Sequence, residues 1–93
     1  MSEKKKVCLV TGASSGIGRA FARRFNSLGH EVVLVGRNLE KLEETSKDFN
    51  SCLVSTCDVA DINACREVVD NAIAKFGRID VLVNCAGCMY FTL

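Results

Sequence analysis

Three glycines, at positions 12, 16 and 18, stand in the segment TGASSGIG (residues 11–18), between a strand-like run and a helix-like run. A dinucleotide-binding turn needs one glycine for its tight bend, one where the backbone approaches a pyrophosphate, and one for helix–strand packing. The following helix would direct free N–H groups and its positive dipole end toward the phosphates, and Ser14 and Ser15 can add hydroxyl donors. We therefore predict a pyrophosphate site here; the alternative is a tight turn without a ligand.

A second candidate is the C-x-x-C formed by Cys85 and Cys88. A thioredoxin-type pair opens a helix that lowers the thiol pKa, but here an apolar, irregular stretch follows. A structural zinc site needs four ligands, commonly two such pairs, and the remaining cysteines form no second C-x-x-C: Cys8, Cys52, Cys57 and Cys65. We predict that this spacing is coincidental and that the chain holds no metal.

The composition limits the classes of protein that fit. The chain has 93 residues, 48% of them hydrophobic, and a net charge of +1. We therefore expect one ordered domain at most. A net charge this small argues against a nucleic acid or a membrane as a partner held mainly by electrostatic attraction. No run reaches the ~18 apolar residues of a membrane span, and the apolar stretch after MSEKKK is too short for a signal peptide. With no secretion signal, six cysteines fit a reduced, cytoplasmic protein.

Apolar strand-like runs alternate with amphipathic helical patterns along the whole sequence. Strands are predicted at residues 7–11, 31–36, within 51–59 and at 79–84. Helices should run from Ile17 to a cap at Gly29, from an N-cap at Asn38, and from Asp61 to Phe76 with Gly77 beyond. The third helix should bury a stripe made of Ile62, Cys65, Val69, Ala72, Ile73 and Phe76.

This order, β-α-β-α-β-α-β, predicts an α/β fold with a parallel, doubly wound Rossmann-type sheet. The strand order should be 3-2-1-4, with a switch point between strands 1 and 4, where ligands bind at the carboxyl ends. The fourth strand would then be a bare edge, and residues 89–93 would have no partner. We expect a chain of this kind to be marginally stable and prone to aggregate.

Three motifs together resemble the short-chain dehydrogenase/reductase family over nearly the whole chain. They are TGASSGIG, then CDV at residues 57–59, and then VNCAG at residues 83–87, where Cys85 replaces the second Asn of the family's Asn-Asn-Ala-Gly. The resemblance implies that residues 1–93 are the N-terminal part of an NAD(P)-binding domain whose catalytic half is absent. The implied cofactor-binding residues are Thr11, Gly12, Ser14, Ser15, Gly16, Ile17, Gly18, Arg37, Asp58, Val59, Asn84, Ala86 and Gly87.

Two of these residues have a structural alternative. Asp58, which in the family would contact the adenine, could only cap the next helix. Asn84 could serve mainly to hold the end of the fourth strand in register with its neighbours.

Arg37 bears on which dinucleotide is bound. An acid at the end of the second strand would accept hydrogen bonds from the ribose 2′-hydroxyl of NAD, whereas an Arg accommodates the 2′-phosphate of NADP. The sequence there reads Gly36-Arg37-Asn38, with no acid. We expect NADP(H) rather than NAD; the alternative is a solvated loop arginine.

The family's catalytic Ser and Tyr-x-x-x-Lys are not in this sequence, whose only tyrosine is Tyr90. The resemblance implies the NADP(H)-binding portion of an oxidoreductase that interconverts a carbonyl and an alcohol. The substrate would be a small molecule bound by a longer protein. Only that longer protein could form a homo-oligomer. This chain by itself would be inactive. The alternatives are a non-catalytic dinucleotide-binding or regulatory module, and a redox or metal protein that uses Cys85 and Cys88.

Overall fold

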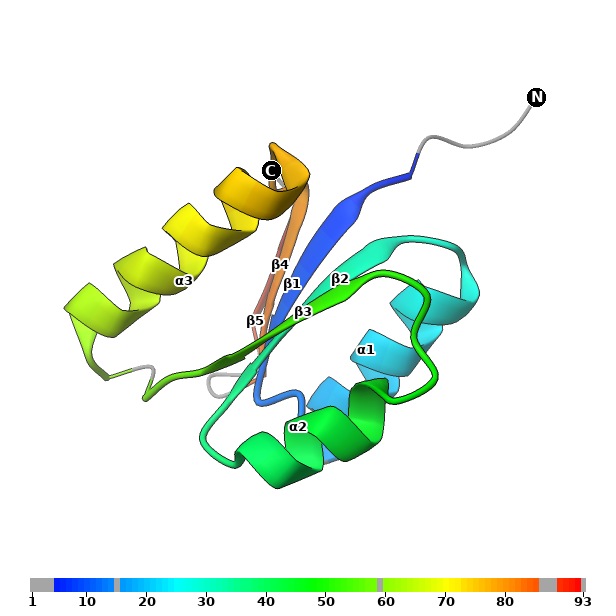
Figure 1. The fold of residues 1–93 in the computed structure, drawn as a ribbon, viewed down its shortest axis with the longest axis horizontal. Helices are drawn as coiled ribbons and strands as arrows, with labels where there is room; N and C mark the ends of the chain where they lie inside the picture. Colours follow the sequence, from blue (N-terminus) through cyan, green and yellow to red (C-terminus); the bar gives the residue numbers. More distant parts are fainter. Residues whose placement is uncertain (1–4, 15, 59, 86–88, 93) are drawn as a thin grey trace.

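The computed structural model describes residues 5–14, 16–58 and 60–85, and the backbone of residues 89–92. Within these residues, three helices and five strands follow one another (Figure 1). In order they are β1 (Val7–Thr11), α1 (Gly16–Ser27), β2 (Glu31–Gly36), α2 (Leu39–Ser46), β3 (Cys52–Thr56), α3 (Ile62–Phe76), β4 (Val81–Asn84) and β5 (Met89–Thr92).

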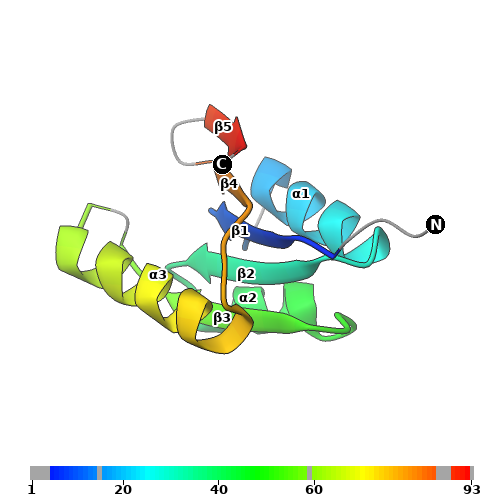
Figure 2. The same cartoon turned by 90° about the horizontal axis from the view of Figure 1, so that it is seen from above.

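The strands form one sheet in the order β3-β2-β1-β4-β5 (Figure 2). The first four strands are parallel, as the alternation of strands and helices predicted, and the partial Rossmann-type fold and the 3-2-1-4 order are confirmed. Thr11 lies opposite both Val35 of β2 and Asn84 of β4. The carboxyl ends of these strands therefore meet at one edge of the sheet, beside the start of α1.

The prediction of a bare fourth strand was wrong. Residues 89–92 form β5, which runs antiparallel to β4 and pairs Asn84 with Met89 and Val81 with Thr92. An exposed edge presents unpaired N–H and C=O groups, and a nearby segment of strand-forming residue types can satisfy them by folding back. The segment therefore gains its structure from the edge beside it, although its own pattern is irregular.

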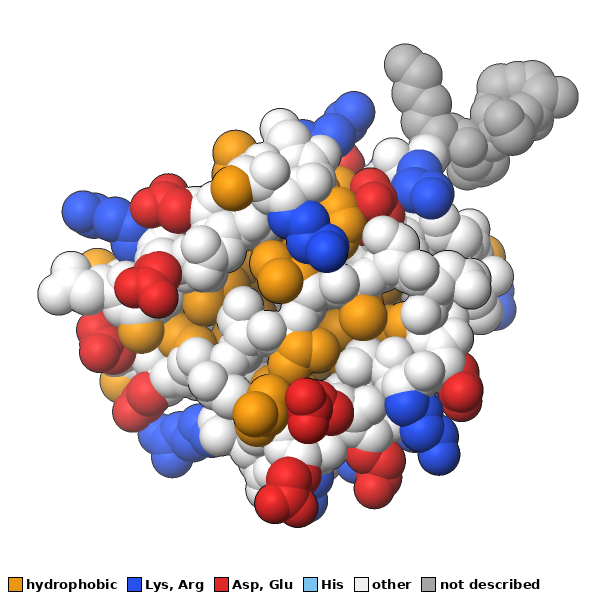
Figure 3. All heavy atoms as spheres, in the orientation of Figure 1, with side chains coloured by type: hydrophobic (Ala, Val, Ile, Leu, Met, Phe, Trp, Pro, Cys, Tyr) orange, Lys and Arg blue, Asp and Glu red, His pale blue; other side chains and the backbone are white. Residues whose placement is uncertain are grey.

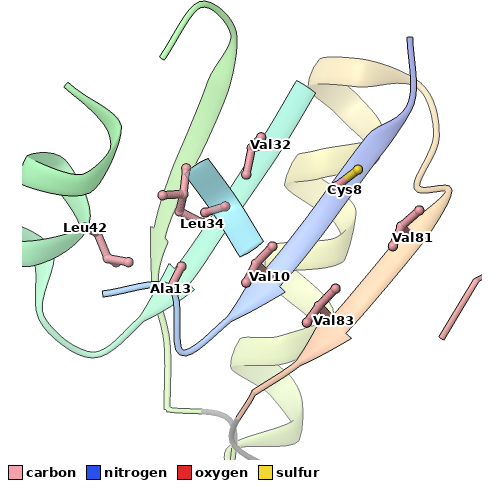
Figure 4. Close-up of a cluster of buried hydrophobic side chains, with 9 residues drawn as sticks. Cys8, Val10, Ala13, Val32, Leu34, Leu42, Val81 and Val83 are labelled. Atoms are coloured by element: carbon pink, nitrogen blue, oxygen red, sulfur yellow. The ribbon is translucent and has the colours of Figure 1, made fainter. Parts of the chain in front are cut away.

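Two apolar clusters occupy the two faces of the sheet. On one face, α1 and α2 cover side chains of alternate strand positions, including Val10, Leu34 and Val83, with Leu42 reaching in from α2 (Figure 4). On the other face, α3 covers Leu9, Val33 and Val35 (Figure 1). Side chains alternate between faces along a strand, so each buried strand supplies both clusters.

The buried stripe of α3 differs from the predicted one. The structure buries Val68, which the prediction left out, together with Ala72, and it half-buries Cys65 and Phe76. The remaining predicted members are exposed: Ile62, Val69 and Ile73. Apolar residues surround more than one side of this helix, so its sequence period does not decide which side meets the sheet.

No described helix is long and apolar enough to cross a membrane.

The predicted helix caps at Asn38, Asp61 and Gly77 are confirmed. The Asn38 side chain accepts a hydrogen bond from the N–H of Lys41, and Asp61 accepts from Asn63 and Ala64. Gly77 adopts a left-handed φ of 84° at the end of α3. Such caps satisfy backbone groups that have no partner within the helix.

Asp80, which the sequence analysis did not single out, joins the beginnings of β1 and β4. Its Oδ2 accepts the backbone N–H of Val7 at 2.9 Å, and its own N–H donates to the Val7 carbonyl at 2.9 Å. Arg78 donates to Oδ1 from Nε at 2.9 Å and from Nη2 at 2.6 Å. These hydrogen bonds, that of Val7 first, hold the pKa of the Asp80 carboxyl below its ordinary value of 3.8.

We predict that Asp80→Asn lowers the free energy of unfolding by about 1.5–3 kcal/mol at pH 7, because the amide offers one uncharged acceptor oxygen where the carboxylate uses two, one for Val7 and one for Arg78. The folded-state pKa is depressed, so the carboxylate stabilises above 3.8 and loses this effect as the pH falls through the folded pKa. The difference between Asp80→Asn and the parent protein in urea unfolding should therefore shrink toward acid pH. Asp70→Asn, on the exposed side of α3, is the control; an equal loss in both variants would contradict the prediction.

Candidate functional site

The predicted site residues that the structure describes lie at the carboxyl ends of β1, β2, β3 and β4 or in the segments that follow them. The turn from β1 to α1 lies at the centre of this edge, and α2 begins beside it (Figure 1). Four predicted residues fall outside the described part of the chain: Ser15, Val59, Ala86 and Gly87.

The turn after β1 depends on glycine at two positive φ angles, 65° at Gly12 and 59° at Gly16. A side chain in this region of φ is strained. The N–H of Ala13 donates to the Val35 carbonyl at 3.1 Å, which fixes the turn to the end of β2. A Cβ at Gly16 would have no atom within 4 Å, so the space in front of this residue is open.

Gly18 has the opposite surroundings. A Cβ built on it would overlap the backbone carbonyl of Gly12. The first turn of α1 therefore packs directly against the end of β1, in the way that the prediction assigned to one of the three glycines. The neighbouring Ile17 is 64% exposed, so it does not contribute to the core.

Arg19, in the first turn of α1, contacts the glycine-rich turn, and the sequence analysis missed it. Its Nη2 donates to the Ser14 carbonyl at 2.7 Å, and its Nε is buried with no hydrogen-bond partner among the described residues. The guanidinium thus holds the backbone of the glycine-rich turn from inside. The signal in the sequence that could have indicated this contact was a basic residue directly after the last glycine.

Thr11 joins β1 to β4 at the switch point. Its Oγ1 lies 3.0 Å from Asn84 Oδ1, to which it donates, and it accepts the N–H of Cys85 at 3.1 Å. This geometry agrees with the alternative in which Asn84 holds the strand end in register. The side chain of Cys85 packs against the core cluster under α1 and α2, and Cys88 lies outside the described residues, so the C-x-x-C prediction is not tested.

Arg37 and Asp58 meet across the ends of β2 and β3. The Arg37 Nη2 lies 3.2 Å from Asp58 Oδ1, which also accepts the N–H of Ala60 at 3.0 Å. The Ala60 hydrogen bond, and after it the Arg37 guanidinium, hold the pKa of the Asp58 carboxyl below its usual range. Asp58 does not cap α3, because that role belongs to Asp61.

The end of β2 passes close to the glycine-rich turn. A Cβ at Gly36 would lie 3.5 Å from Ser14 Oγ and 3.2 Å from Leu42 Cδ2. A larger residue at this position would press on both the turn and α2. The small residue therefore lets Ser14 and the backbone before Arg37 share one corner of the site.

A cavity of about 230 Å³ extends from this edge between α3 and the sheet. Its lining is mostly apolar and includes Thr11, Asn84, Cys57, Cys65, Val68 and Val69. Hydrophobic side chains are visible on this face in the band between α3 and α2 (Figure 3). The cavity thus opens beside the switch point, next to the Thr11–Asn84 contact.

Comparison with known proteins agrees with this geometry. A model of the family described as short chain dehydrogenase matches residues 6–92. An uncharacterized oxidoreductase of Staphylococcus epidermidis is 42% identical over 85 residues, which are 90% of this chain and 37% of that protein. The chain therefore spans little more than a third of this relative's length.

Solved structures with nicotinamide cofactors superpose on the same part. Actinorhodin polyketide ketoreductase with NADPH has a TM-score of 0.80 at 37% identity, covering 86% of this chain and 32% of that one. A 3-ketoacyl-(acyl-carrier-protein) reductase of Brucella melitensis complexed with NADH has a TM-score of 0.79 at 35% identity, covering 83% and 32%. The match over residues 6–92 shows that this chain belongs to the short-chain dehydrogenase family of oxidoreductases.

Proposed function

We propose that the chain is the NADP(H)-binding portion of an oxidoreductase that interconverts a carbonyl and an alcohol. The observation that carries this proposal is the turn at residues 11–18. It places the N-terminus of α1 at the carboxyl edge of a parallel sheet, and the space before Gly16 is open.

The pyrophosphate would bind at this turn. The first N–H groups of α1 have no partner within the helix, and the helix dipole favours a negative charge there. The open space before Gly16 admits a ligand close to the backbone, and Ser14 lies at the same corner beside Gly36. The residues present therefore fit a dinucleotide, with Ser15 as a further expected donor.

Arg37 would bind the 2′-phosphate that distinguishes NADP from NAD. Its side chain is 78% exposed, and its partner Asp58 is 52% exposed. An ion pair this open to solvent contributes little stability, so the guanidinium can turn from the carboxylate to a phosphate without a large loss. The NADPH complex of one relative supports this choice, whereas the NADH complex of another means that the family alone does not decide it.

The other expected contacts follow the strand ends. Asp58 and Val59 would lie at the adenine, and Thr11 and Asn84 would shape the nicotinamide end together with Ala86 and Gly87. When bound, the nicotinamide would supply the hydride that reduces a carbonyl carbon. The residues of this chain would bind and orient it, while the proton donor that the family supplies from Tyr-x-x-x-Lys has no counterpart in this sequence.

A direct test is to titrate the purified chain with NADPH and with NADH and to measure the binding by calorimetry. We expect saturable binding of NADPH, tighter than that of NADH, and no oxidation of NADPH when a ketone is added. Absence of binding to both dinucleotides in a folded sample would overturn the proposal.

We predict that Arg37→Glu lowers the preference for NADPH over NADH by about 10- to 100-fold, which corresponds to the ~1.5–3 kcal/mol of a hydrogen bond to a charged group. The Glu would repel the 2′-phosphate and could accept from the 2′-hydroxyl. The measurement is the ratio of the two dissociation constants. Arg23→Glu, the same charge change on an exposed position of α1, should leave the ratio unchanged. An unaltered preference in Arg37→Glu would show that Arg37 does not select the cofactor.

Gly16 and Gly29 offer a matched pair for testing the pyrophosphate site. Both have a positive φ, 59° and 89°, and a Cβ on either would meet no atom within 4 Å. We predict that Gly16→Ala and Gly29→Ala each lower the free energy of unfolding by about 1–2 kcal/mol, because both adopt a left-handed backbone. Only Gly16→Ala should weaken NADPH binding, by roughly tenfold or more, since its methyl group enters the space assigned to the ligand. Equal affinities in the two variants would place the pyrophosphate elsewhere.

A further inference from the structure

The thiol groups of Cys57 and Cys65 lie close to each other. Their Sγ atoms are 3.8 Å apart. Cys57 follows the end of β3, and Cys65 lies in the first turns of α3. A disulfide has a sulfur–sulfur distance of about 2.05 Å, so a small shift of the two side chains would allow bond formation.

The two thiols also have a route to solvent. Both line the cavity between α3 and the sheet, next to Val68 and Val69. Cys57 is only 7% exposed, whereas Cys65 is half-buried. A small reagent entering the cavity would therefore meet Cys65 more readily than Cys57.

The sheet separates this pair from the other described cysteines. Cys57 and Cys65 belong to the apolar cluster under α3. Cys8, Cys52 and Cys85 belong to the cluster under α1 and α2, on the opposite face. Burial raises the pKa of Cys8 to about 11, so that thiol stays protonated and unreactive at neutral pH.

We propose that Cys57 and Cys65 form a reversible intramolecular disulfide by exchange with a small-molecule disulfide such as oxidised glutathione. The two cysteines would then be a thiol modification site next to the carboxyl edge of the sheet, distinct from the C-x-x-C at residues 85–88. Formation of this disulfide needs only the two cysteine side chains and no bound dinucleotide.

The exchange proceeds in two steps. The Cys65 thiolate attacks one sulfur of oxidised glutathione, a mixed disulfide forms, and one glutathione thiolate leaves. The Cys57 thiolate then attacks the Cys65 sulfur of the mixed disulfide and releases the second glutathione. The two protein thiols are oxidised, one glutathione disulfide is reduced to two glutathione thiols, and the two protons lost by the protein end on these thiols.

The order of the steps follows from the surroundings of the two sulfurs. Burial, and then the hydrogen bond with Cys65, raises the pKa of the Cys57 thiol. Cys57 is therefore the poorer first nucleophile, but it is already in place to attack a mixed disulfide on its neighbour.

The disulfide would tie β3 to α3 around the segment that carries Asp58. This segment is already held at both ends, by the Ala60 N–H on Asp58 Oδ1 and by the Asp61 cap of α3. Cross-linking residues that are already near each other restrains the unfolded chain more than the folded one. The oxidised protein should therefore melt at a higher temperature than the reduced protein.

The test is oxidation of the chain with mixtures of oxidised and reduced glutathione, followed by alkylation, cleavage before aspartate and mass spectrometry. Cleavage before Asp48, Asp58, Asp61 and Asp70 separates Cys57, in fragment 48–57, from Cys65, in fragment 61–69. We expect these two fragments to become linked before any other pair, and dithiothreitol to release them. The oxidised protein should also show the higher melting temperature.

Variants identify the sulfurs involved. Fragment 48–57 also contains Cys52, so Cys52→Ser should still form the link, whereas Cys65→Ser and Cys57→Ser should not. A link that persists in Cys57→Ser, a different pair that forms first, or full alkylation of Cys57 and Cys65 under oxidised glutathione alone would overturn the proposal. The parent chain gives the last two results without any substitution, so the test does not rely on a variant that folds.

Discussion

The contact between Gly18 and the carbonyl of Gly12 is the constraint on which the site depends. With no Cβ at Gly18, the first turn of α1 lies directly against the backbone that leaves β1. Any side chain there would push the helix away from the sheet, and the open N–H groups of α1 would move with it. The two left-handed glycines let the chain reverse within this short space. Arg19 then holds the turn through the Ser14 carbonyl.

The parallel register brings the remaining groups to this turn. Thr11 lies opposite Asn84 on one side and Val35 on the other, so one residue at the end of β1 aligns three strands. The Thr11 hydroxyl uses both its donor and an acceptor in this alignment, toward Asn84 and Cys85. Thr11, which was predicted as a ligand contact, thus aligns the strand ends. The shape of the proposed nicotinamide end would depend on this alignment.

The sequence predicted the four parallel strands because their alternation with amphipathic helices leaves few topologies. It predicted the helix caps for a local reason: Asn38, Asp61 and Gly77 act on backbone groups a few residues away. It did not predict β5, because that strand depends on the edge offered by β4. It also misplaced the buried side of α3, since Ile62 and Ile73 are as apolar as the residues that face the sheet.

The pairing of Arg37 with Asp58 combines both kinds of information. Each residue was predicted separately, for different parts of a dinucleotide, yet β2 and β3 are neighbours in register and their ends bring the two side chains together. The predicted strand order 3-2-1-4 already contained this contact. The carboxylate balances the guanidinium. In the proposed complex, a 2′-phosphate would compete for the same guanidinium, while the Asp58 carboxylate would keep the hydrogen bond from the Ala60 N–H. The proposed cofactor would therefore replace one ion pair, which water already weakens, with another.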